Sequence, residues 1–113
     1  MLLLETSEEL LPARNVGWIV RSLGERGILS AVDAVLLARP PVSDFTRRPD
    51  KAERARLRAE QAAVVVEVIS SYNPQAVVCA GVPFGHTRPQ WIIPHGGEIT
   101  VDGARQRVFA DYS

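Results

Sequence analysis

Apolar residues occur in three short continuous runs, at residues 2–4, 34–38 and 76–80. Runs of this length that end in polar or turn-forming residues are typical of strands buried on both faces of a sheet. The pattern therefore predicts three buried strands. Glu5 follows directly after the first of them, so it is expected at a strand end.

Two longer segments show helical spacing instead. Over residues 13–26 the apolar positions recur at i, i+3, i+4 and i+7, with Pro12 suited to the first turn and Gly27 to a left-handed stop. A second helix is predicted from Asp50 to about residue 71, with Asp50 and Glu53 as a capping box. The positions expected to face the core are Val16, Ile19, Val20 and Leu23 in the first helix and Leu57, Gln61, Val64, Val65 and Val68 in the second.

The C-terminal part alternates polar and apolar residues over 98–101 and 106–109, on either side of Asp102–Gly103. Alternation around Asp-Gly is a strong hairpin signal. At 113 residues the chain has room for one domain with one core. We therefore expect a single α/β domain whose mixed or antiparallel strands are covered on one face by two main helices, followed by a C-terminal hairpin.

Composition and charge narrow the function classes. Thirteen basic and thirteen acidic residues give no net charge, which argues against nucleic acid as a partner. The arginine-rich segment at 47–58 is mixed with acidic residues and lacks aromatic ones, so a solvated helix face is favoured over a nucleic-acid surface.

Cys79 is expected to be a small buried hydrophobe. The apolar stretch at the start of the chain ends after four residues at Glu5, which is too short for a signal peptide or a membrane span. This favours a cytoplasmic protein without a membrane partner.

The candidate chemistry lies in residues 81–97, which hold four glycines, three prolines and both histidines. A conformationally restricted loop directly after a buried strand is a common place for functional side chains. His86 is the first candidate for a general base, and a loop histidine that only packs or hydrogen-bonds is the alternative. Glu5 can orient His86 if their strands are neighbours. A metal site of His86 and His95 is a weaker hypothesis, because no third ligand accompanies them.

Two motifs resemble a known family of serine peptidases, the LD-carboxypeptidases and microcin C resistance proteins. Tyr72–Asn73–Pro74, an apolar strand, Phe84–Gly85–His86–Thr87 and Pro89–Gln90–Trp91 resemble the family's histidine motif. Leu2–Leu3–Leu4–Glu5 resembles its strand ending in the catalytic glutamate. Thr6 stands where the family often has an acidic residue, and the 47–58 segment is extra material relative to the family's pattern.

The resemblance implies a small swivelling β/β/α-type C-terminal domain that supplies two members of a Ser-Glu-His triad. His86 would act as catalytic acid and base, and Glu5 would hold it and balance its charge. An N-terminal domain would supply the serine, and no metal or cofactor is implied. The substrate would be a murein tetrapeptide or a peptidyl or aminoacyl nucleotide. The residues that make up the motifs resemble the microcin C resistance branch of the family more closely.

No serine of this chain stands in the glycine-flanked strand-to-helix elbow that such a nucleophile needs. We therefore expect that the nucleophile domain is absent from residues 1–113, that the chain alone is inactive, and that its exposed domain interface can form a homodimer. The alternative function is a non-catalytic peptide- or nucleotide-binding module using Trp91 and the arginine-rich segment, although core packing is favoured for Trp91 and Phe84. The serines are Ser7, Ser22, Ser30, Ser43, Ser70, Ser71 and Ser113.

Overall fold

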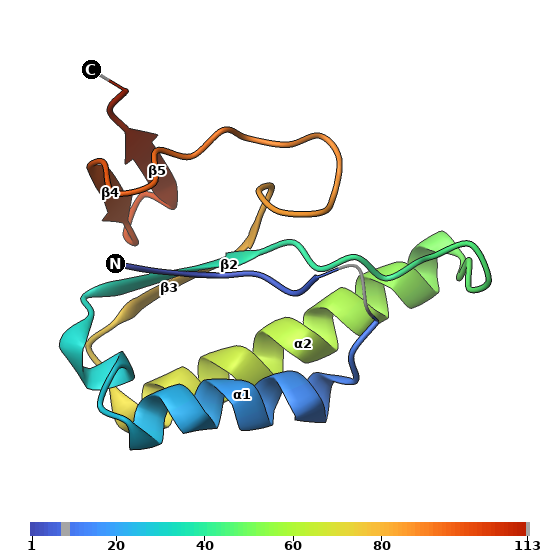
Figure 1. Ribbon diagram of the computed structural model, residues 1–113, viewed down its shortest axis with the longest axis horizontal. Helices are drawn as coiled ribbons and strands as arrows, with labels where there is room; N and C mark the ends of the chain where they lie inside the picture. The colour runs from blue at the N-terminus through green and yellow to red at the C-terminus, as the bar shows by residue number, and fades with distance from the viewer. Residues whose placement is uncertain (8–9, 113) are drawn as a thin grey trace.

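A computed structural model describes residues 1–7 and 10–112 of the chain, so Ser113 lies outside the described residues (Figure 1). Within these residues, two helices and five strands follow one another, with a short 3₁₀ turn before the second strand. In chain order the elements are β1 (Leu2–Leu4), α1 (Ala13–Glu25), η1 (Leu29–Ala31), β2 (Ala34–Ala38), α2 (Lys51–Tyr72), β3 (Val77–Val82), β4 (Ile99–Asp102) and β5 (Arg107–Ala110).

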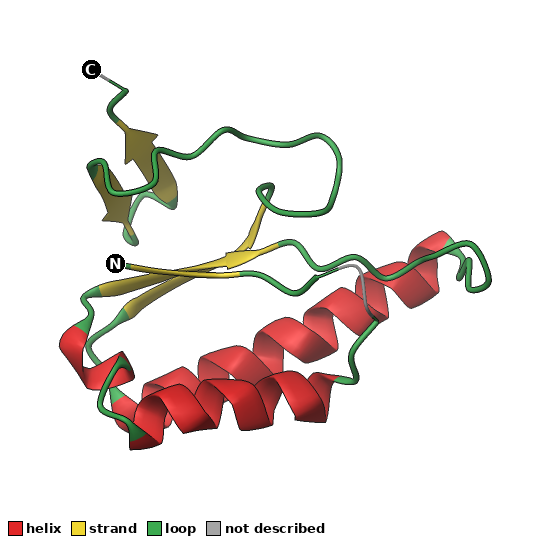
Figure 2. Cartoon of the chain, viewed as in Figure 1, coloured by secondary structure: helices red, strands yellow, loops and turns green. Residues whose placement is uncertain are grey.

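The elements form three layers. The strands β1, β2 and β3 make a parallel sheet in that spatial order, and β4 and β5 make a separate antiparallel hairpin. Figure 2 shows both helices against one face of the sheet, and the hairpin with the loop that precedes it over the other face. The predicted α/β class, the two helices on one face and the C-terminal hairpin are confirmed. Both strand directions occur, but antiparallel pairing is confined to the hairpin.

The central strand β2 is buried on both faces, which explains its unbroken apolar run. Successive side chains of a strand point to opposite faces. Val35 and Leu37 accordingly belong to the core cluster under the helices, whereas Leu36 and Ala38 belong to the cluster under the hairpin. All five residues of this strand are buried, whereas β1 is only partly buried and β3 has one buried residue, Val82, so the prediction of a buried strand is confirmed for β2 alone.

The helices approach each other closely at two glycines of α1. A Cβ atom at Gly17 would lie 2.6 Å from Val64 Cγ1, and one at Gly24 would lie 2.6 Å from Tyr72 Cγ. Both glycines are buried on the core-facing side of α1, and a search for apolar side chains does not identify them because glycine has none. As a result the buried face of α1 is rotated from the predicted one, and Ile19, expected in the core, is 55% exposed.

The predicted helix ends are largely confirmed. Asp50 caps α2 by accepting the backbone N–H of Glu53 at 2.8 Å, and Gly27 has the expected positive φ of 77° after α1. The second hydrogen bond predicted by the capping box, from the Asp50 backbone N–H to the Glu53 side chain, is wrong, because the Glu53 carboxylate accepts hydrogen bonds from Arg56 instead. No helix within the described residues is both long and apolar enough to cross a membrane.

Candidate active site

The parallel sheet brings three chain segments to one edge. The carboxyl ends of parallel strands share an edge, and in open α/β sheets ligands bind in the crevice outside those ends. Glu5 follows β1 at this edge, Arg39 follows β2, and the loop carrying His86 follows β3. In Figure 1 the three strands run in the same direction and their following loops leave the sheet on the same side.

The expectation that the strands before Glu5 and His86 are neighbours is wrong, since β2 lies between β1 and β3. Adjacent strands are ~4.8 Å apart, so the loop must span ~10 Å to reach Glu5. Gly85 makes this possible. Its φ is +88°, and a Cβ atom there would overlap Glu5 Oε2 and lie 3.3 Å from Glu5 Cδ. The glycine both turns the backbone and lets the carboxylate pack against it.

The side chains of His86 and Glu5 meet at this edge. His86 Nδ1 lies 3.3 Å from Glu5 Oε2, and the two side chains are 40% and 44% exposed. Because Nδ1 faces the carboxylate, Nε2 on the other side of the imidazole points away from Glu5. The proximity that the sequence demanded is confirmed, and the catalytic role of the two residues stays a prediction.

Hydrogen bonds hold the loop around His86 in one path. The Gln90 side-chain amide donates to the Gly85 carbonyl, and the Trp91 backbone N–H donates to the Pro83 carbonyl at 2.6 Å. Thr87, the residue after His86, is buried with 8% of its surface exposed. An exposed imidazole is therefore carried by a backbone that is fixed on both sides.

The aromatic residues of this loop divide between core and surface. Phe84 is buried in the cluster beneath the hairpin, as predicted. Trp91 is 53% exposed, so its expected role in the core is wrong. Cys79, expected to be buried, is only partly buried against the same cluster as Phe84. Trp91 and the 83% exposed Ile92 thus leave apolar surface on the loop that carries His86.

An open pocket of 590 Å³ lies beside His86. Its other walls come from the loop after β2 and from the first turn of α2. Periodicity did not identify these residues as site residues, because it cannot tell which arginines of a charged helix face solvent and which face a neighbouring loop. The lining residues are Pro41, Ser43, Asp44, Phe45, Arg48, Arg54 and His86.

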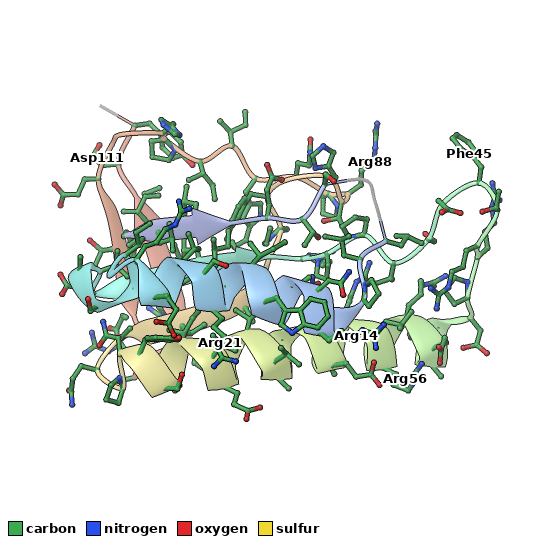
Figure 3. The ribbon with its side chains drawn as sticks, turned by 60° about the horizontal axis from the view of Figure 1, so that its bottom comes forward. Arg14, Arg21, Phe45, Arg56, Arg88 and Asp111 are labelled. Atoms are coloured by element: carbon green, nitrogen blue, oxygen red, sulfur yellow. The ribbon has the colours of Figure 1, made fainter. Side chains whose placement is uncertain are left out.

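The loop wall of this pocket is built by a turn centred on Asp44. The Thr46 backbone N–H and hydroxyl donate to Asp44 Oδ1 at 2.8 and 2.9 Å, and the Arg47 N–H donates to it at 2.6 Å. Such side-chain bonds to the following backbone are typical of Asx turns. Phe45 is held at the tip of the turn with 96% of its surface exposed, and Figure 3 shows it projecting from the end of the molecule.

Acidification is expected to loosen this turn. The pKa of Asp44 is lowered, first by the Arg47 N–H and then by the Thr46 hydroxyl and N–H, because all three bonds favour the carboxylate. A lowered pKa stabilises the fold above the unfolded value of 3.8, and this stabilisation is lost as pH falls through the folded value. The amide chemical shifts of Thr46 and Arg47 should therefore titrate at acid pH. The control is Asp44→Asn, whose side chain keeps a hydrogen-bond acceptor but has no carboxylate to protonate. If the Thr46 and Arg47 amide shifts titrate in the same way in this variant, Asp44 is not the titrating group.

The arginine-rich segment also divides in two. Arg56 pairs with Glu53 and Glu60 on the outer face of α2, which agrees with the predicted solvated face. Arg48 and Arg54 instead line the pocket. Within residues 1–7 and 10–112, no group of three His, Cys, Asp or Glu side chains is arranged to hold a metal ion, so no third ligand joins His86 and His95 there.

The fold and the site define a class of α/β domain that presents a histidine–carboxylate pair at the carboxyl edge of a parallel sheet. Residues 1–101 match the family model of the LD-carboxypeptidase C-terminal domain, from β1 into β4. The chain therefore belongs to this family, which forms the C-terminal part of serine peptidases, and the predicted family is confirmed. No curated protein and no solved structure matches the chain.

Proposed function

We propose that this domain supplies the histidine and the glutamate of a serine peptidase whose nucleophile belongs to an N-terminal domain. The observation that carries the proposal is the 3.3 Å contact between His86 Nδ1 and Glu5 Oε2 at the carboxyl edge of the sheet. A base oriented by a carboxylate through one ring nitrogen, with the other nitrogen available, is the arrangement that Ser-His-acid triads require.

In the proposed reaction His86 Nε2 accepts the proton of the serine hydroxyl while the serine oxygen attacks the amide carbonyl carbon. The imidazolium then donates this proton to the leaving amine as the C–N bond breaks. Water repeats the sequence on the acyl enzyme, which releases the acid and restores the serine. Glu5 keeps the proton of the neutral ring on Nδ1 and balances the charge of the imidazolium. The sequence of steps needs no metal or cofactor.

The exposure of the pair supports a role for a second domain. A charge that develops on a side chain 40% exposed to water is stabilised weakly by its partner, because the local dielectric is high. A domain that covers the edge excludes water and strengthens the interaction. The exposed side chains of Trp91 and Ile92 on the same loop provide apolar surface for this contact. In the free domain the same surface would support homodimer formation.

Two substrate classes belong to this proposal. The first is the terminal L,D-linked amide of a murein tetrapeptide, and the second is a peptidyl or aminoacyl nucleotide such as microcin C. The histidine motif and the Val35–Leu36–Leu37–Ala38–Arg39–Pro40 segment favour the microcin C resistance branch. A cytoplasmic location suits the nucleotide substrate.

Reconstitution tests the proposed function. The chain alone should hydrolyse neither an L,D-tetrapeptide nor an aminoacyl nucleotide, because triad members act as a unit and the sequence offers no suitable serine. Fusion to a nucleophile-bearing N-terminal domain of the same family should produce turnover of one of the two. The matched control is the same fusion with that domain's serine replaced by alanine. Turnover by the chain alone, or by the serine-less fusion, would refute the proposal.

A non-catalytic binding module is the second candidate. It is favoured by the exposed ring of Trp91 and by Arg48 and Arg54 in the pocket beside His86. Calorimetry with murein peptides and aminoacyl nucleotides distinguishes the two functions. Binding to the chain together with an inactive fusion supports the module, whereas turnover by the fusion supports the peptidase.

A further inference from the structure

The pocket beside His86 carries an excess of positive charge. Its lining holds two guanidinium groups, on Arg48 and Arg54, against one carboxylate, on Asp44. The carboxylate is already engaged, since Asp44 Oδ1 accepts three hydrogen bonds within its own turn. In the part of the chain that the structure describes, neither arginine forms an ion pair with an acidic side chain.

The contrast with Arg56 shows that this is a local feature. Arg56 lies two residues after Arg54 on the same helix and pairs with both Glu53 and Glu60 on the outer face. The two acidic residues of α2 in these pairs are not among the residues that line the pocket. Figure 3 shows Arg56 at the helix and Phe45 on the loop that rises away from it.

A second group of arginines extends the positive field toward the end of β2. Burial lowers the pKa of Arg58, and the neighbouring charges of Arg39 and Arg54 lower it further. Arg58 donates to the Pro40 carbonyl at 3.3 Å, and Arg54 donates to the Pro49 carbonyl at 3.2 Å. Backbone carbonyls therefore orient two of these guanidinium groups, while like charges remain close together.

We propose that this pocket is an anion subsite, in which Arg48 and Arg54 bind a carboxylate or phosphate group of the substrate next to His86. A guanidinium group binds a carboxylate or a phosphate through two parallel N–H donors, because its planar fork matches the spacing of two oxygens of the anion. The volume of 590 Å³ lies within the range of small-molecule sites. The exposed ring of Phe45 adds an apolar wall for the part of the substrate that adjoins the anion. The subsite is a substrate site only if the proposed peptidase function holds.

Calorimetry on the chain alone tests the subsite with two pairs of probes. The first pair is N-acetyl-L-lysyl-D-alanine and its C-terminal amide, and the second is adenosine monophosphate and adenosine. We expect the charged member of at least one pair to bind more tightly than its neutral twin. Binding of the peptide carboxylate alone identifies a peptide substrate, and binding of the phosphate alone identifies a nucleotide; either result supports the subsite. Equal binding of charged and neutral probes in both pairs would overturn it.

Variants assign the effect to the two arginines. Arg48→Gln and Arg54→Gln together should weaken the charged probe by about tenfold or more, whereas Arg56→Gln, on the outer face, should leave it unchanged. Equal weakening by Arg56→Gln would also overturn the subsite. If the double variant unfolds, the Nε–H signals of Arg48 and Arg54 in the unmodified chain replace it, and their failure to shift on adding the bound probe counts against the proposal. Because binding needs no turnover, an inactive fusion that still binds the anion refutes the peptidase and leaves the subsite standing.

Discussion

Replacing His86 by alanine in the fused enzyme is expected to lower kcat by at least about 10⁴-fold, with a much smaller change in KM. In the proposed mechanism the imidazole takes the serine proton, and Glu5, whose Oε2 lies 3.3 Å from His86 Nδ1, orients it. Without it the serine stays protonated and the leaving amine receives no proton. Steady-state kinetics on the substrate identified by reconstitution measures the effect. The fold should be unaffected, since the side chain is 40% exposed.

His95 provides the matched control for this prediction. It is an exposed histidine in the same loop, and His95→Ala removes the same chemical group without touching the pair at the sheet edge. This variant should retain nearly full activity. Equal losses from the two substitutions, or an active His86→Ala enzyme, would refute the assignment of His86 as the acid and base.

Gly85→Ala is expected to cost both stability and activity. An alanine at φ +88° is strained by about 1–2 kcal/mol, and its Cβ atom would overlap Glu5 Oε2. Either the loop or the carboxylate must move, so His86 and Glu5 separate. A misplacement of this size typically lowers kcat by about 10²-fold. Thermal unfolding of the chain and kinetics of the fused enzyme measure the two effects.

Gly96→Ala separates backbone strain from displacement of the carboxylate. Gly96 also has a positive φ, of 75°, but a Cβ atom there would meet nothing within 4 Å. This variant should show a similar cost of strain and retain activity. If Gly96→Ala lowers kcat as much as Gly85→Ala, the close packing of Gly85 against Glu5 is not what positions the pair.

The site could be predicted from the sequence only as a set of residues. The glycine- and proline-rich loop after a buried strand predicts His86 as a candidate, and the position of Glu5 at a strand end predicts a partner for it. The catalytic assignment of both depends more on the resemblance to the family than on their local chemistry. The pocket residues Phe45, Arg48 and Arg54 were missed as a site, since helical spacing treats the charged segment as one solvated face. Only the packing of the 40–50 loop against α2 shows that Arg54 lines the pocket while Arg56 faces outward.

The sequence by itself determined the α/β class, the two helices, the hairpin and the family, because these depend on local periodicity and on motifs that are continuous in the chain. Only the tertiary structure decided the strand order, which places β2 between the strands that end near Glu5 and His86. Strand order is a matter of long-range pairing, which no local pattern contains. The role of Gly85 follows from that order, because a backbone with positive φ and no Cβ atom brings the loop across β2 to the carboxylate.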